Sequence, residues 1–164
     1  MAESDLTAAR VRQVFDYNPE TGEFYRKMDR MGRQIPPHKV GMTLPMGYIY
    51  ISIDTKLVRA HRLAWLYMTG AWPELHIDHI NGVKDDNRFC NLRHVSPRTN
   101  AENRRRPKAT ATSGYMGVSR DRALWRAVIR IDGKQKHIGT FKTPEDAAEA
   151  YLRAKRDLHE GCTI

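Results

Sequence analysis

Apolar residues follow helical and strand spacings in turn along the first part of the chain. Residues 5–16 carry an apolar stripe at helical spacing after a polar cap, and residues 47–53, GYIYISI, are rich in the β-branched and aromatic residues typical of strands. Residues 58–70 return to helical spacing and end at Gly70, a natural helix stop. Residues 28–46 contain many Gly, Pro and Met residues without a period, which predicts a loop.

The middle of the chain predicts a strand, a loop, a second strand and a helix. A short strand is expected at HIDHI, residues 76–80. A polar and turn-like segment follows, and residues 91–96 are expected to form the second strand. Ser96 followed by Pro97 favours a helix start, because Ser caps free N–H groups and Pro suits the first helical position. The helix is expected over residues 97–105.

The last fifty residues are expected to fold as a separate unit after a linker at 107–113. Strands are predicted at 117–120, 125–131 and 136–141, the second of which alternates clearly between apolar and polar residues. An amphipathic helix follows, with Thr143 as its N-cap. One helix covers only one face of a three-stranded sheet, so the other face is expected to stay free.

The charge balance points to a polyanionic partner. The 164 residues include 28 Lys and Arg against 19 Asp and Glu, a formal net charge of +9. Nucleic acid is the commonest partner of so basic a protein, although a basic surface without a ligand is the alternative. No segment has the apolar run of a signal peptide or a membrane span, and a cytoplasmic location is expected. Cys90 and Cys162 are isolated, so a zinc set is not predicted and any metal would have oxygen and nitrogen ligands.

Residues 76–103 hold the densest cluster of polar side chains that suit catalysis. Asp78 and His79 end the first strand of the predicted unit, and Asn100 lies in the first turn of its helix. A carboxylate and an amide oxygen are able to share a hard cation such as Mg²⁺. Because neighbouring strand residues point in opposite directions, His79 is expected to face away from Asp78 and to polarise a water as general base. The alternative is that Asp78, Asn91 and Asn100 are turn and cap residues.

The same run resembles the HNH nucleases of the phage and homing-endonuclease type, in their His–Asn–Asn variant. Asn91 follows His79 by twelve residues, and Asn100 comes nine residues later. The resemblance implies a ββα-metal fold in which His79 is the catalytic base and Asn91 supports catalysis by bracing the loop through backbone hydrogen bonds. It also implies that Asp78 and Asn100 bind the metal. The usual motif ends in His where this chain has Asn100, which favours Mg²⁺ or Mn²⁺.

Several neighbouring residues are candidates for the edge of this site. The helix containing AHRLAW resembles a helix that precedes the motif in these nucleases, which makes His61 and Arg62 candidate phosphate contacts. Local packing of His61 is the alternative. His76 shares a strand face with Asp78. Arg104 lies four residues after Asn100 and is a candidate phosphate clamp, or else a solvated charge.

The C-terminal fifty residues resemble the DNA-binding domain of plant ethylene-response factors, a domain that phage nucleases also carry. The residues that carry this resemblance are Tyr115, Gly117, Val118, Trp125, Ile129, Gly139, Thr140, Phe141, Ala147, Ala148, Ala150 and Tyr151. Core packing is the expected role of the larger side chains in this set, Trp125, Ile129, Phe141 and Tyr151. The family lays its sheet in the DNA major groove, which implies that the DNA-facing residues here are Ser119, Asp121, Arg126, Val128, Arg130, Gln135 and His137.

Arg130 is the best candidate in this set for a guanine contact, because Arg binds guanine through two hydrogen bonds. The plant pattern has Arg at the positions of Ser119 and Asp121 and Glu at that of Val128. A plant-type target sequence is therefore not expected. A merely solvated basic face is the alternative.

Together these patterns predict an α+β protein, with a ββα-metal HNH module followed by a three-stranded antiparallel sheet packed on one helix. The expected domains are 1–75 leading into the nuclease, 76–106 as its core, 107–113 as linker and 114–161 as DNA-binding domain. The predicted activity is metal-dependent cleavage of double-stranded DNA, a nick by a monomer, in the host cytoplasm if the gene is a phage gene. The rivals are a DNA-binding regulator with a decayed nuclease module and a nuclease directed at RNA, whose narrow major groove a sheet does not read.

Overall fold

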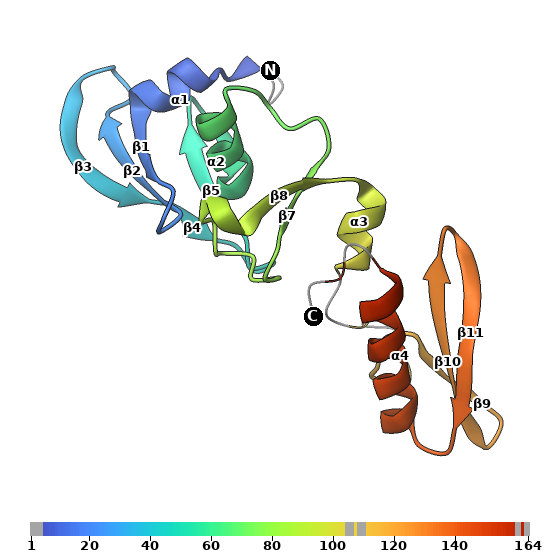
Figure 1. Cartoon of the computed structure of the whole chain (residues 1–164). Helices are drawn as coiled ribbons and strands as arrows, with labels where there is room; N and C mark the ends of the chain where they lie inside the picture. Colours follow the sequence, from blue (N-terminus) through green and yellow to red (C-terminus); the bar gives the residue numbers. More distant parts are fainter. Residues whose placement is uncertain (1–4, 104–106, 108–110, 160–161, 163–164) are drawn as a thin grey trace. The chain divides into compact units, whose positions relative to one another are not determined.

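The computed structural model describes residues 5–103, 107, 111–159 and 162 (Figure 1). The expected α+β class is confirmed, since several small antiparallel sheets occur together with helices. The chain divides into two compact units, Met1–Ser96 and Pro97–Ile164. In the described part, no helix is both long and apolar enough to cross a membrane.

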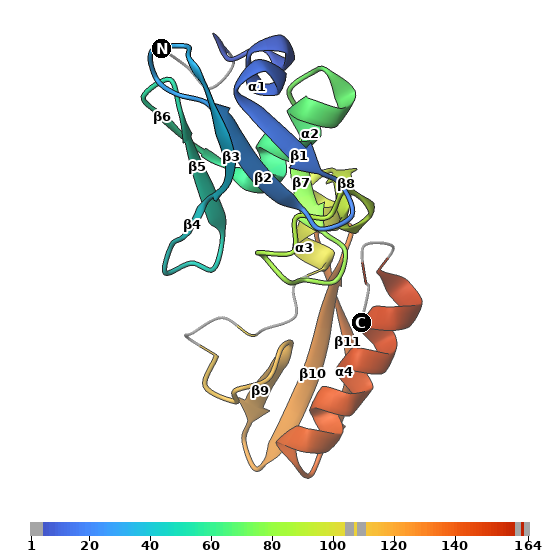
Figure 2. The same cartoon turned by 90° about the vertical axis from the view of Figure 1, so that its left-hand side faces the viewer.

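The described residues of the first unit form two three-stranded sheets, one two-stranded sheet and two α-helices (Figure 2). In chain order its elements are α1 (Ala8–Val14), β1 (Phe15–Asn18), β2 (Glu23–Met28), β3 (Gln34–Val40), β4 (Met42–Thr43), β5 (Ile49–Ile53), β6 (Lys56–Arg59), α2 (Ala60–Thr69), β7 (His76–His79), the short 3₁₀ helix η2 (Phe89–Asn91) and β8 (Leu92–Val95). The strand orders are β1-β2-β3, β4-β5-β6 and β7-β8.

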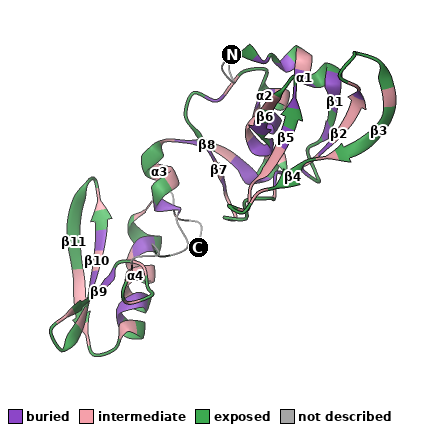
Figure 3. Cartoon of the chain, turned by 180° about the vertical axis from the view of Figure 1, so that it is seen from behind, coloured by how far each residue is buried: buried purple, intermediate pink, exposed green. Residues whose placement is uncertain are grey.

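One hydrophobic core joins these elements. Leu63 and Leu66 of α2 are almost fully buried beside Phe15 of β1, and the β7–β8 hairpin reaches the same core through Ile77 and Leu92 (Figure 3). The helix ends where the sequence predicts. Gly70 adopts a left-handed conformation with φ of 85°, and its N–H closes the last turn of α2 on the Leu66 carbonyl. The β7–β8 hairpin is therefore built on the N-terminal residues rather than beside them.

The prediction of a loop over residues 28–46 is wrong. Strand β3 pairs with β2, with Val40 opposite Phe24, and β4 pairs with β5, with Met42 opposite Tyr50. Main-chain hydrogen bonds hold these strands, while most of their side chains are exposed, so no apolar alternation marks them in the sequence. The prolines of β3 are tolerated because it is an edge strand.

The second unit begins with α3 (Pro97–Glu102) and continues with β9 (Val118–Asp121), β10 (Leu124–Ile131), β11 (Lys134–Phe141) and α4 (Pro144–Leu158). The sheet is antiparallel with the order β11-β10-β9, and the turn before β11 has positive φ at Asp132 and Gly133, as two-residue hairpins require. Helix α4 packs on this sheet through Ala147 and Ala148, and Thr143 caps the helix by accepting a hydrogen bond from the backbone N–H of Asp146.

Candidate functional site

Asp78 and His79 lie next to each other on β7 and point to opposite faces of the hairpin. Asp78 is opposite Arg93 in the register, and the Arg93 guanidinium donates to its carboxylate at 2.9 Å. His79 shares its face with Ile77, which belongs to the core. The face of β7 that carries Ile77 and His79 is the buried one. The imidazole of His79 is therefore surrounded by protein.

The imidazole of His79 is only 4% exposed. Its Nε2 lies 3.1 Å from Oδ1 of Asn87, and the rings of His61 and Tyr48 lie 5.0 Å and 6.1 Å away, centre to centre. Burial, the largest cause, lowers the pKa of His79 below its ordinary value, so the neutral base form prevails at neutral pH. The ring is enclosed by protein, and its expected role in polarising a water stays a prediction.

Asn87 is a site residue that the sequence patterns missed. It lies in the loop between β7 and η2, 1% exposed, and its Nδ2 donates to the carbonyl of Asp85 at 3.3 Å. Tyr17 of β1 donates its hydroxyl to the Asn87 carbonyl at 2.7 Å. The polar segment after His79 reads as a turn in the sequence, and no spacing distinguishes the one amide that faces the histidine.

Asn91 makes three hydrogen bonds inside the same loop. Its Oδ1 accepts from the N–H of Asn81 at 3.0 Å, and its Nδ2 donates to Oδ1 of Asn81 at 3.0 Å and to the Asp86 carbonyl at 2.8 Å. Its own carbonyl accepts from the N–H of Ile80. These contacts are of the loop-bracing kind expected of Asn91, since they join the start of the loop to its end.

The loop also contains a strong ion pair. Arg88 donates to Asp86 at 2.7 Å and 2.8 Å, and Asn81 donates to the same carboxylate. The Arg88 hydrogen bond is the main reason that the pKa of Asp86 falls to about 2. The Asp86 carboxylate, whose charge acts on His79, is therefore ionised throughout the physiological range.

His61 and Arg62 of α2 both have local packing partners. His61 is 3% exposed, its Nδ1 has no hydrogen-bond partner among the residues that the structure describes, and burial lowers its pKa to about 3. Arg62 places its guanidinium over the Trp72 ring, 5.5 Å from the centroid. The geometry matches the packing alternative for His61, and phosphate contact by either residue stays a prediction. His76 is exposed at the start of β7, opposite Val95.

The donors expected to bind a metal are both oxygen groups. The Asp78 carboxylate is partly buried and is a hard oxygen donor, but the Arg93 guanidinium donates to its Oδ2, so a metal ion would bind it in competition with Arg93. Asn100 lies in α3, in the second unit, and its approach to Asp78 stays a prediction. Among the described residues, no three His, Cys, Asp or Glu side chains gather as a metal cluster. A carboxylate and an amide oxygen fit a hard ion that completes its shell with water and phosphate, and the identity of the ion stays a prediction.

The face of the C-terminal sheet opposite the one that packs on α4 carries the residues expected to meet DNA. In the register, Arg126 is opposite Ser119 and Arg130 is opposite Gln135. The same alternation puts the remaining predicted positions on this face, namely Asp121, Val128 and His137. The structure therefore gathers the seven predicted positions on one surface. Arg104 lies outside the described residues.

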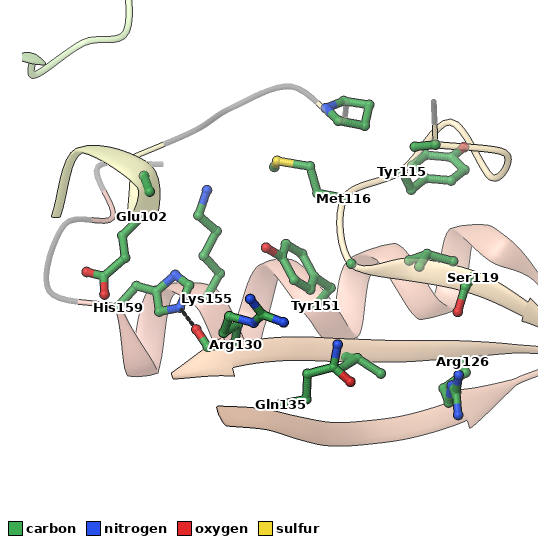
Figure 4. Close-up of a pocket in the computed structure, with 16 residues that line it drawn as sticks. Glu102, Tyr115, Met116, Ser119, Arg126, Arg130, Gln135, Tyr151, Lys155 and His159 are labelled. Carbon is green, nitrogen blue, oxygen red and sulfur yellow. Dashed lines mark hydrogen bonds between the residues drawn. The ribbon is translucent and has the colours of Figure 1, made fainter. Parts of the chain in front are cut away.

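A hollow of about 440 Å³ lies beside this face in the second unit (Figure 4). Arg130 and Gln135 reach it from the sheet, and Tyr151 and Lys155 reach it from α4. Strand β9 has four residues and pairs with only half of β10, which has eight. Lys155, which is 1% exposed, is a further cationic residue that the sequence patterns did not single out.

Comparison with known proteins bears on the segment that contains Asp78, His79 and Asn100. The family model described as HNH endonuclease matches residues 58–102. "Protein 3.8" of Escherichia phage T7 is 35% identical over 107 residues, which cover 63% of this chain and 87% of that protein. No solved structure gives a significant match. None of these findings supports an ethylene-response-factor-like domain at residues 114–161, and that assignment stays a prediction.

Proposed function

The chain belongs to the family of Protein 3.8 of Escherichia phage T7 and carries an HNH endonuclease domain at residues 58–102, and from this premise we propose that it is a metal-dependent DNA endonuclease. The observation that carries the proposal is the β7–β8 hairpin inside the matched segment, which holds a carboxylate and a buried neutral imidazole on adjacent residues, Asp78 and His79. These are the groups that phosphodiester hydrolysis needs.

In the proposed reaction, His79 is the general base. Its imidazole takes a proton from the attacking water, the water oxygen bonds to phosphorus, and the bond from phosphorus to the 3′ oxygen breaks. Burial favours the neutral form of His79 that this step requires. Asn91 supports the step indirectly, because its hydrogen bonds set the shape of the loop that follows His79.

Asp78 and Asn100 are the residues that would hold a divalent ion, Mg²⁺ or Mn²⁺. When bound, such an ion supplies positive charge at the phosphate and at the leaving oxygen. Arg93 keeps the Asp78 carboxylate in place by a hydrogen bond of 2.9 Å. His61, Arg62 and His76 are proposed to lie at the edge of the site.

The second unit is proposed to bind the DNA duplex. Its free sheet face presents Arg126 and Arg130 from one strand, in a chain whose net charge is +9. Arginine side chains on a flat face suit both phosphate contact and guanine recognition in the major groove. One active site for each chain predicts a nick in one strand.

Plasmid nicking tests the proposed function. Supercoiled DNA should become open circular with Mg²⁺ or Mn²⁺, and EDTA should stop the reaction because the ion is removed from Asp78 and Asn100. Asp78→Ala should lower the rate at least about 100-fold, whereas Glu74→Ala, a nearby exposed carboxylate, should not. A chain that shifts DNA in a gel but never cuts it with either ion would instead be the DNA-binding regulator.

A further inference from the structure

We infer that Asn87 is a positioning residue for His79: it holds the imidazole in the tautomer with its proton on Nε2 and its lone pair on Nδ1. The inference rests on the proposed role of His79 as base. It concerns a residue outside the three positions of the nuclease motif, which are His79, Asn91 and Asn100. The nitrogen that takes the proton from water would then be Nδ1.

The direction of the hydrogen bond follows from the partners of Asn87. Its amide nitrogen donates to the Asp85 carbonyl, an acceptor with no proton to give, so the amide oxygen is the atom that faces His79. An amide oxygen only accepts. Nε2 of His79, at 3.1 Å, must therefore be the donor and carry the proton.

Burial makes this choice of tautomer strict. Asn87 is 1% exposed and His79 is 4% exposed, so water is poorly placed to replace the bond between them. In the other tautomer, the Nε2 lone pair would face the Asn87 oxygen, and two buried acceptors would lie 3.1 Å apart without a proton. The rings of His61 and Tyr48 pack beside the imidazole and oppose its rotation.

The N-terminal hairpin holds Asn87 itself in place. The Tyr17 hydroxyl donates to the Asn87 carbonyl, and the turn between β1 and β2 packs directly on the Asn87 peptide. Gly22 of that turn leaves no room for a side chain, since an added Cβ would lie 2.4 Å from the Asn87 carbonyl carbon. The hydrogen bonds between Tyr17 and Asn87 and between Asn87 and His79 thus give residues before the HNH-matched segment a part in the reaction.

Nuclear magnetic resonance of the metal-free full chain tests the tautomer without any need for activity. With ¹⁵N-labelled histidine at neutral pH, His79 should show a protonated Nε2 and an unprotonated Nδ1, and the signal is assigned by its loss in His79→Ala. Asn87→Leu, which has similar volume and no amide, should give a mixture of tautomers. A wild-type signal with the proton on Nδ1 would overturn the inference even if the protein cuts DNA.

Kinetics test the consequence for catalysis. Asn87→Leu should lower kcat about 10–100-fold with little change in KM, which is the usual range for residues that orient a catalytic group. Asp85→Asn is the matched control, because it changes an exposed side chain of the same loop and keeps the carbonyl that Asn87 uses. Tyr17→Phe should give a smaller decrease in kcat.

The two proposals fail separately. If the wild type cuts DNA and folded Asn87→Leu keeps the wild-type kcat, Asn87 does not position the base, although the endonuclease proposal stands. If no DNA is cut under any condition, the endonuclease proposal fails, and the tautomer measurement still decides whether Asn87 orients His79. Should Asn87→Leu not fold, the wild-type tautomer and the kcat of Tyr17→Phe decide.

Discussion

At the scale of the residue, the site is defined by two neutral histidines enclosed in protein. His61 and His79 are 3% and 4% exposed, and burial is the largest cause of the lowered pKa of each. A base that stays neutral is ready to accept a proton at neutral pH. The same burial links the stability of the fold to pH, because the unfolded chain is able to protonate both side chains.

Acid should therefore destabilise the protein through His61. Its folded pKa, about 3, is below the ordinary 6.5, so the stabilisation is complete above pH 6.5 and is lost as the pH falls toward 3. The free energy of unfolding should fall by about 1.4 kcal/mol per pH unit in this window for one such group. Urea unfolding at pH 7 and pH 5 measures the change, and His61→Phe should show a weaker pH dependence. An equal dependence in both proteins would contradict the assignment.

Asn91 should matter more for folding than for binding a metal. Asn91→Ala removes three side-chain hydrogen bonds from the loop and should lower the free energy of unfolding by about 2–4 kcal/mol. Asn100→Ala is the comparison, because a metal ligand should cost cleavage while changing stability by less than about 0.5 kcal/mol. Chemical denaturation followed by circular dichroism separates the two, and equal stability of both variants would refute this division.

At the scale of the element, apolar spacing predicted the helices and strands that bury one face. It missed strands that are held mainly by main-chain hydrogen bonds. Helix α2 and strand β10 carry clear patterns because one face of each is buried. Strand β3 was missed because its side chains are mostly exposed and only its backbone pairs with β2. The motif led to the metal and catalytic positions proposed on β7, but not to the partner Asn87, since contacts within an irregular loop leave no period in the sequence.

Gly117, just before β9, gives a test at this scale. Its φ is +68°, and a Cβ there would lie 2.2 Å from the Tyr151 ring. Gly117→Ala should therefore lower the free energy of unfolding of the second unit by at least about 2 kcal/mol. Gly133→Ala is the matched control, with φ of +76° and nothing within 4 Å of the added Cβ, and should cost about 1 kcal/mol. Equal losses would mean that Tyr151 does not pack against Gly117.

At the scale of the whole molecule, the chain combines a nuclease hairpin in one unit with a basic sheet face in the other, and its net charge is +9. The seven positions expected to meet DNA share that face, and the DNA-reading role proposed for it is independent of the chemistry at His79. The two functions should accordingly respond to different substitutions.

DNA affinity should depend on the sheet face. Arg130→Ala should weaken binding to a duplex about 10-fold, and it should reduce the slope of log affinity against log salt by about 1 if the side chain meets a phosphate. Arg153→Ala is the matched control, since Arg153 is an exposed arginine of α4, the helix on the covered side of the sheet. Fluorescence anisotropy at several salt concentrations measures both, and equal binding by the two variants would exclude this face.

Single-turnover cleavage by His79→Ala, with DNA affinity measured on the same preparation, tests the central claim most directly. The account predicts that cleavage with Mg²⁺ is abolished, that the dissociation constant for DNA changes less than about 3-fold, and that His38→Ala, an exposed histidine of β3, cuts like the wild type. Full cleavage by a folded His79→Ala protein would contradict the account.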